Sequence, residues 1–499
     1  MTPHLPPELW THIALYLEND SSSLTNCARV CHQWQPVFER LLYRNIRLLS
    51  EGFQPGKGFV SLSQFRGLVS GSNQYRRSFI RRLEYIVITP HKLHDYRAVK
   101  LQGYRDQNPV RDANNQAFWT GMKSLFEFLS SWEEGPKFAL VPAAHGRDVT
   151  LEPETEAKEL AYSWEVELDG ERVVGPYRAR FPDDVPMLPQ VTCINDLSIK
   201  WGYDYIWVGT ALQIAESCLG LQRFDLDMDD TVRPDHLWYM QERRQAVASG
   251  LLRLQSTLRV LKCMGSFEHP WSNTLPALDL RPANSKIDEL SSSLRLLSCN
   301  LKELYLSGMS FDMDFLLPLD DSGSPTTDAS SLHWPYLESI VLAGVPGHLP
   351  SGEWLFDYEL DTGDEEDFPD PATGDEIFES RWLREGYQIS RHKMNTEYFH
   401  RLFISLGYAA RCMPLLRTIL FAFYSRPTTV FKFNRDRCST SFGAKPCLKF
   451  ESATGYTPDR RIAAAWGFSL DDLVVDNPWP DKAPEYVCSS VTLDRLPNE

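Results

Sequence analysis

The sequence predicts an α/β protein in which a small three-helix module precedes a long array of alternating strands and helices. Two patterns predict this fold. Three short stretches with helical apolar spacing fill the N-terminus, and beyond Pro189 short strand-like pieces recur between helix-like stretches. The 499 residues leave room for two or three domains. We expect their boundaries at 1–50, 51–189 and 190–499.

The N-terminal module is predicted from its helix signals. Pro7 suits the first turn of a helix, and the residues after it are apolar over an unusually wide arc. The serine run at 21–23 is expected to cap a second helix, and Pro36 to open a third. Because so small a unit cannot bury this much apolar surface by itself, we expect the remainder to meet the rest of the chain and a partner protein.

The same residues resemble an F-box. The resemblance lies in the ordered series Leu5-Pro6, Glu8-Leu9, Ile13, Leu17, Leu24, Val30-Cys31 and Trp34. It implies a Skp-type adaptor as partner, bound chiefly through Leu5, Pro6, Leu9, Ile13, Leu17, Val30, Cys31 and Trp34. An unrelated three-helix subdomain with a tryptophan in its core is the alternative interpretation.

The region 51–189 is expected to be a mixed α/β region that links the N-terminal module to the array beyond residue 189. It contains a predicted helix over 114–132, with one apolar side formed by Phe118, Met122, Leu125, Phe126 and Leu129. Asp169-Gly170 is a strong type I′ turn signal between strands predicted at 162–168 and 172–180. The region therefore combines a helix with a hairpin.

The array beyond residue 189 is predicted from strand-like pieces with regularly placed apolar residues. They lie at 194–199, 221–226, 258–263, 301–306, 337–342 and 416–421, and an earlier one lies at 83–88. Helix-like stretches are expected at 206–218, 237–254, 287–297 and 398–413. This order resembles an irregular leucine-rich-repeat solenoid, of the degenerate kind that follows fungal F-boxes, although the asparagine ladder of regular repeats is absent. An unrelated α/β domain is the alternative.

The side chains between the apolar positions of these strands are expected to share the concave face. Candidate target-binding residues on that face are Lys200, Arg223, Asp225, Lys262, Glu303 and Tyr305. The last two pieces are apolar on both sides, so we expect both sides to be covered. The cover is either the C-terminal tail, with Trp466, Trp479 and Tyr486, or a cargo protein.

The formal net charge of −16 is concentrated in one segment. Eleven acids and no Lys or Arg lie in 357–379, and the composition of the insertion 357–380 is that of a disordered loop. This composition is compatible both with a solvated loop and with a binding site for a basic target. The balance of charge argues against a general nucleic-acid binder, although less firmly once this segment is set apart.

No motif for catalysis or metal binding stands out. Gly52–Gly58 lacks the spacing and the Ser or Thr of a phosphate-binding loop, and the nucleophile-elbow, zinc-protease and dinucleotide motifs are absent. His91, His94 and Asp95 offer too few ligands for a convincing zinc site. A triad assembled from distant positions stays open. We expect no cofactor and no metal.

The F-box resemblance implies a non-catalytic receptor that holds a target protein for an SCF-type ubiquitin ligase, through the adaptor and a cullin. The alternatives are a scaffold that acts with the adaptor outside a ligase, and an α/β enzyme with a helical N-terminal cap. Neither a secretory signal nor a long apolar run is visible, and the ten cysteines are scattered. We therefore expect a protein of the cytoplasm or nucleus, without membrane or nucleic-acid partners.

Overall fold

The computed structural model describes most of the chain, with gaps. The described residues are 7–17, 21–50, 58–93, 109–132, 135–149, 177–200, 206–228, 237–265, 277–282, 285, 287–357, 393–423, 429–434, 447–452, 456–468 and 474–476. Several sequence predictions lie outside them: Leu5, Pro6, His94, Asp95, the strand at 162–168, nearly all of the acidic insertion, Trp479 and Tyr486. Among the described helices, none is both long and apolar enough to cross a membrane.

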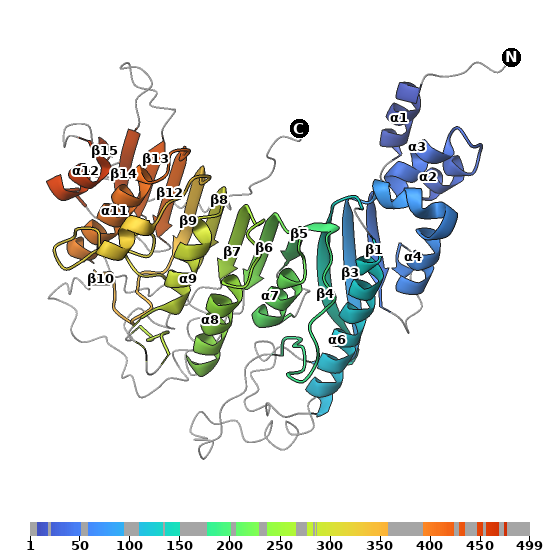
Figure 1. Cartoon of the computed structure of the whole chain (residues 1–499), viewed down its shortest axis with the longest axis horizontal. Coiled ribbons are helices and arrows are strands. Elements are labelled where there is room, and N and C mark those ends of the chain that lie inside the picture. Colours follow the sequence, from blue (N-terminus) through green and yellow to red (C-terminus); the bar gives the residue numbers. More distant parts are fainter. Residues whose placement is uncertain are drawn as a thin grey trace, which may run out of the picture.

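Three short helices form the N-terminal module, as the sequence predicts. They are α1 (Pro7–Tyr16), α2 (Ser21–Ala28) and α3 (Gln35–Leu42). Pro36 lies in the first turn of α3, where its missing N–H costs no helical hydrogen bond. Only Tyr43 and Arg44 separate α3 from the first strand, so the module is joined to the rest of the chain by a very short connection (Figure 1).

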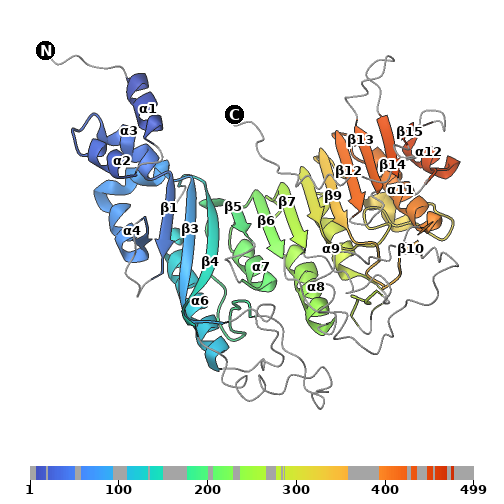
Figure 2. The same cartoon turned by 180° about the vertical axis from the view of Figure 1, so that it is seen from behind.

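A single long sheet forms the rest of the fold (Figures 1 and 2). Its order is β15-β14-β13-β12-β9-β8-β7-β6-β5-β4-β3-β1-β2. The bounds are β1 (Asn45–Leu49), β2 (Val60–Ser61), β3 (Arg82–Lys92), β4 (Phe138–Val149), β5 (Ile194–Ile199), β6 (Arg223–Met228), β7 (Val260–Gly265), β8 (Glu303–Ser307), β9 (Ser339–Val345), β12 (Thr418–Phe423), β13 (Thr429–Asn434), β14 (Cys447–Ser452) and β15 (Val474–Asp476). Within the described strands of this sheet, only the β12–β13 and β13–β14 pairs are antiparallel.

Each of the seven strand-like pieces found in the sequence contributes a strand to this sheet, so those predictions are confirmed. The sheet also continues through strands that the pattern missed. β4 pairs with β3 on one side and with β5 on the other, where Leu140 is opposite both Leu83 and Leu197. Strands from both sides of residue 190 therefore belong to one sheet.

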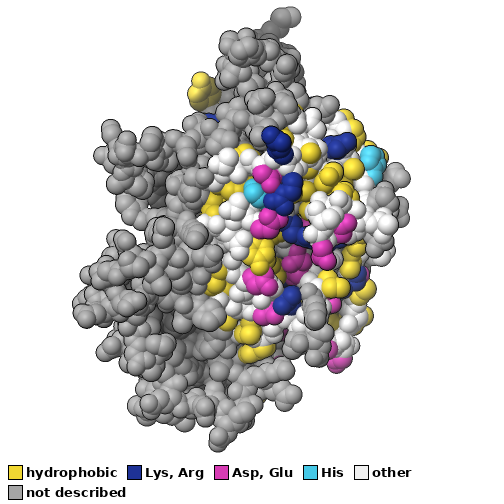
Figure 3. Space-filling model, turned by 90° about the vertical axis from the view of Figure 1, so that its left-hand side faces the viewer, with side chains coloured by type: hydrophobic (Ala, Val, Ile, Leu, Met, Phe, Trp, Pro, Cys, Tyr) yellow, Lys and Arg dark blue, Asp and Glu magenta, His cyan; other side chains and the backbone are white. Residues whose placement is uncertain are grey.

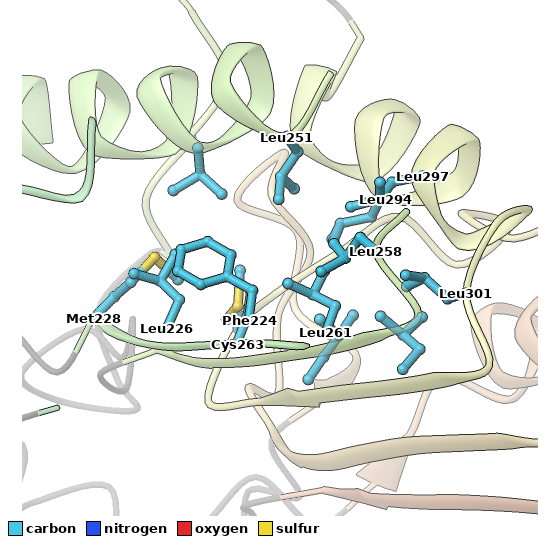
Figure 4. Close-up of a cluster of buried hydrophobic side chains, with 14 of the residues drawn as sticks. Phe224, Leu226, Met228, Leu251, Leu258, Leu261, Cys263, Leu294, Leu297 and Leu301 are labelled. Carbon is cyan, nitrogen blue, oxygen red and sulfur yellow. The ribbon is translucent and has the colours of Figure 1, made fainter. Parts of the chain in front are cut away.

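Helices cover one face of this sheet. They are α4 (Leu62–Leu68), α6 (Pro109–Ser130), α7 (Val208–Glu216), α8 (Leu237–Leu251), α9 (Glu289–Ser298), α11 (Thr396–Arg411) and α12 (Arg460–Trp466), with the 3-10 helices η1 (Gly71–Phe79) and η3 (Thr327–Ser331). The small second sheet pairs β10 (Phe356–Asp357) with β11 (Lys393–Met394). Alternate strand residues point from the large sheet toward the helices, as Phe224, Leu226 and Leu261 do beneath Leu251 and Leu294 (Figure 4).

A buried ion pair ties α8 to α9. Arg244 donates to both carboxylate oxygens of Asp288, each at 2.7 Å, and both side chains are almost fully excluded from solvent. Asp288 is also the N-cap of α9, where it accepts the backbone N–H of Ser291. One carboxylate therefore both caps a helix and holds two neighbouring helices together.

The predicted hairpin stays a prediction, because its first strand lies outside the described residues. Ala179, in the predicted second strand, forms a parallel bridge with Ile206, just before α7. One sequence prediction differs from the structure. Trp466 lies in α12 on the helix-covered side, where its indole Nε1 donates to the Phe403 carbonyl at 2.9 Å and its ring packs on Phe433. Trp466 therefore does not cover the helix-free face, because a tryptophan at the end of an apolar helix gains more by joining the helix-side core.

Candidate protein-interaction surfaces

The N-terminal module has a very small core. Among the apolar side chains described there, Ala14, Leu24 and Phe38 are buried, and half-buried neighbours such as Leu17 and Trp34 pack around them. The Trp34 ring lies 4.4 Å from the ring of Trp10 and 5.6 Å from that of Phe38. This aromatic row fixes α1 against α3.

Helix α1 consequently has a second apolar side that faces solvent. Leu9, Ile13 and Tyr16 follow one another at helical spacing and are 46%, 38% and 91% exposed. They form a stripe opposite the buried Ala14, and we call these three residues the α1 stripe. An exposed apolar stripe on a short helix is typical of a surface that a partner covers.

The structure divides the predicted adaptor-binding residues into three groups. Leu9, Ile13, Val30 and Cys31 are exposed; Leu17 and Trp34 are half-buried in the small core; Leu5 and Pro6 lie outside the described residues. The prediction omitted Tyr16, the most exposed of the apolar residues in α1. The sequence did contain a signal for Tyr16. It lies seven residues after Leu9 and three after Ile13, and both spacings place it on the same side of a helix.

The module is held to the sheet domain by a buried carboxylate. Glu39 of α3 lies 2.6 Å from the Arg76 guanidinium of η1 and accepts hydrogen bonds from Tyr75 and Gln35. Burial alone would raise the pKa of Glu39, but these hydrogen bonds, with that of Arg76 foremost, outweigh burial and hold the pKa below its usual value. The ionised Glu39 therefore anchors α3 on η1.

The second surface is the helix-free face of the sheet, where polar side chains form rows across neighbouring strands. The register places Asp196, Arg223 and Glu303 in one row across β5, β6 and β8. The next row contains Asp225, Lys262 and Tyr305. Lys200 follows β5 at its end and is exposed. The predicted target-binding residues of β6, β7 and β8 thus lie side by side on one face.

Charges of both signs alternate within these rows. The Arg223 guanidinium lies 3.2 Å from Asp225 and 3.9 Å from Asp196, and the Lys262 ammonium lies 6.0 Å from the centre of the Tyr305 ring. Burial and the nearby Asp225 carboxylate raise the pKa of Asp196, against the opposing effect of Arg223. This face is a mixed polar surface suited to hydrogen bonding.

Toward β9 and β12 the same face becomes apolar. Val341 and Leu420, which pair across the two strands, are only half-buried. The expected cover is thus not seen over them within the described part of the chain, since Trp466 lies on the other side.

Two buried cysteines, Cys193 and Cys263, lie in the apolar core of the sheet domain. Burial raises the pKa of Cys193 to about 11 and that of Cys263 to about 12, so both are protonated thiols that pack like small apolar side chains. No group of three or more potential metal ligands is found among the residues that the structure describes. On the side of the molecule formed by the last strands of the chain, basic and acidic side chains are interspersed and form no patch of a single sign (Figure 3).

Comparison with known proteins bears on the N-terminal module. No curated protein matches the chain. A family model described as F-box-like matches residues 2–49, the segment that contains α1, α2 and α3 and ends with β1. The three helices, their small aromatic core and the α1 stripe therefore belong to an F-box-like domain.

Proposed function

We propose that this chain is the substrate-recognition subunit of an SCF-type ubiquitin ligase, composed of a Skp-type adaptor, a cullin and the F-box protein. The observation that carries the proposal is the F-box-like domain at 2–49, with an uncovered apolar stripe on α1. F-box domains in general bind Skp-type adaptors. The chain would act in the cytoplasm or nucleus as a receptor whose own side chains make and break no bond.

The adaptor would cover the α1 stripe. A helix-in-groove contact buries exposed apolar side chains at spacings of three and four residues, as Leu9, Ile13 and Tyr16 provide. Val30 and Cys31 are exposed after α2 and would extend the contact, with Leu5 and Pro6 on the N-terminal side. Leu17 and Trp34 would contribute mainly by holding α1 and α3 in place.

The target would bind the sheet domain. We propose that the strand-helix array is an irregular leucine-rich-repeat-like recognition domain and that its helix-free face provides Lys200, Arg223, Asp225, Lys262, Glu303 and Tyr305. The parallel strands, which pair in chain order, support this proposal. Holding a target next to a charged ubiquitin carrier accelerates transfer by proximity alone.

The test replaces an apolar contact by a charge. Leu9→Asp should abolish recovery of the adaptor with the purified chain, because an aspartate cannot enter an apolar groove without losing its hydration. Leu252→Asp, after α8, is the matched control: it makes the same change at a residue of similar exposure far from the F-box-like domain, and it should leave recovery unchanged. Thermal unfolding checks that both variants fold.

Recovery of the adaptor, a cullin and one specific further protein together supports the ligase. Adaptor recovery without any cullin would favour a scaffold outside a ligase. If Leu9→Asp and Ile13→Asp still recover the adaptor as well as the wild type does, the proposal is wrong.

A further inference from the structure

The loops that lead into β7, β8, β9 and β12 form a continuous edge of the sheet. Their residues are 252–259, 299–302, 332–338 and 412–417, and we call them the basic loop edge. Backbone hydrogen bonds link one loop to the next: the Lys302 N–H donates to Arg259, the Glu338 N–H to Lys302, and the Arg417 N–H to Glu338, at 2.6–2.8 Å. Side chains from four loops therefore lie in one row.

This edge is basic in a chain that is acidic overall. The four loops contain Arg253, Arg259, Lys302 and Arg417 and a single acid, Glu338, whereas the whole chain has a net charge of −16. Lys302 and Arg417 share that one carboxylate, at 3.5 Å and 3.8 Å. Arg253 pairs in addition with Glu216 of α7 at 2.9 Å. Two carboxylates therefore face four cations, so the row keeps an excess of positive charge.

The same loops expose large apolar side chains. Leu252, Tyr336 and Leu415 are 57%, 51% and 49% exposed. The guanidinium carbon of Arg259 lies 5.5 Å from the centre of the Tyr336 ring, so a cation and an aromatic face are presented together. Cations interleaved with exposed apolar side chains are a surface for a partner that offers both acids and apolar groups.

We propose that the basic loop edge binds an acidic segment of the target protein, one that also carries apolar side chains. The proposal rests on the receptor function above and narrows its target class. Charge complementarity selects the acids of the partner, and Leu252, Tyr336 and Leu415 give its apolar side chains a place to pack. The edge offers four cations, too few to neutralise the continuous phosphates of a nucleic acid.

The position of this edge fits the receptor function. Helix α3 leads directly into the N-terminal end of β1, and β1 to β9 and β12 are parallel, so the F-box-like domain and the basic loop edge lie at the same edge of the sheet (Figure 1). A target segment bound here would be presented on the side from which the adaptor is bound.

The test measures binding of a synthetic peptide made of Asp and Glu with two leucines and a phenylalanine, by fluorescence anisotropy on the full chain. Lys302→Glu combined with Arg417→Glu should weaken binding about tenfold, and raised salt should weaken it for the wild type. Glu338→Gln should strengthen binding, because it removes the repelling carboxylate that pairs with Lys302 and Arg417. Leu415→Ser should weaken binding without changing its salt dependence.

The matched control is Lys123→Glu combined with Arg460→Glu, charge reversals at a half-buried residue of α6 and an exposed residue of α12, which should leave binding unchanged. Equal weakening by the control, equal binding of poly-glutamate, or tighter binding of a single-stranded oligonucleotide would overturn the proposal. Stronger peptide binding after deletion of 361–380 would also overturn it. That result would mean that, in the intact chain, the acids of this segment occupy the edge. All these variants should still recover the adaptor, so failure here is distinct from failure of the proposed function.

Discussion

The F-box-like domain and the sheet domain handle apolar surface in opposite ways. Of the apolar side chains that the structure describes in the three short helices, Ala14, Leu24 and Phe38 form the core, whereas the sheet and its helices share one continuous core. The small domain therefore leaves apolar side chains in water, whereas the large one presents polar rows over β5 to β8 on its free face. Under the proposed function, the first region would be covered by the adaptor, and the second would select the target by charge and hydrogen bonding.

The largest expected effect lies inside the sheet domain. Asp288→Ala leaves the Arg244 guanidinium buried without its carboxylate and removes the cap of α9, so it should lower the free energy of unfolding by about 3–5 kcal/mol. Urea denaturation measures this. Glu289→Ala, at the exposed neighbouring position, should stay within about 0.5 kcal/mol of the wild type, and a similar loss for both variants would contradict the assignment.

Phe38→Ala tests the small core in the same way. It removes the largest buried side chain of the F-box-like domain and should cost that domain about 3 kcal/mol, since the half-buried Leu17 and Val37 can move into part of the space. Adaptor binding should be lost while the main unfolding transition of the sheet domain is retained. A single transition shifted as a whole would show instead that the two regions unfold together.

The contribution of the Glu39–Arg76 contact between the two regions to stability should depend on pH. Because the pKa of Glu39 is lowered in the folded protein, its contribution to stability is complete above the usual value of 4.5 and is lost as the pH falls through the folded pKa. Glu39→Gln should cost about 1–2 kcal/mol near neutral pH. The difference between the two proteins should vanish in acid. A difference that is constant with pH would exclude an ionised Glu39.

The smallest effect on stability is expected at the most exposed apolar residue. Tyr16→Ala should change the free energy of unfolding by less than about 0.5 kcal/mol, because the ring makes little contact with the folded chain. Binding of the adaptor should nevertheless weaken measurably. Unchanged binding, measured by titration of the adaptor, would remove Tyr16 from the α1 stripe.

Much of the fold could be predicted because single strands and helices carry their own periodicity. The piece predicted at 221–226 alternates so that Phe224 and Leu226 enter the core, and α6 shows one apolar side over about three turns. β4 was missed because its run from Val141 to Ala144 has no alternation: it is apolar throughout and contains a proline. Its pairing with β3 and β5 comes from neighbours far away in the sequence.

The candidate surfaces were predictable in part for the same reason. The F-box resemblance identified Leu9 and Ile13, and the period of two placed Arg223, Lys262 and Tyr305 on one face. Neither signal identified the basic loop edge, because Arg259, Lys302 and Arg417 are scattered in the sequence. Parallel pairing alone brings them into one row.

The sequence by itself determined the local features of this protein: three N-terminal helices, the F-box signature and the alternation of strands with helices. Those features depend on contacts within a few residues, which periodicity records. Only the tertiary structure decided that Trp466 joins the helix-side core, that Glu39 anchors one region to the other through Arg76, and which loops meet at the edge of the sheet. Such contacts join residues distant in the chain, and the register of a shared sheet, rather than any local pattern, brings them together.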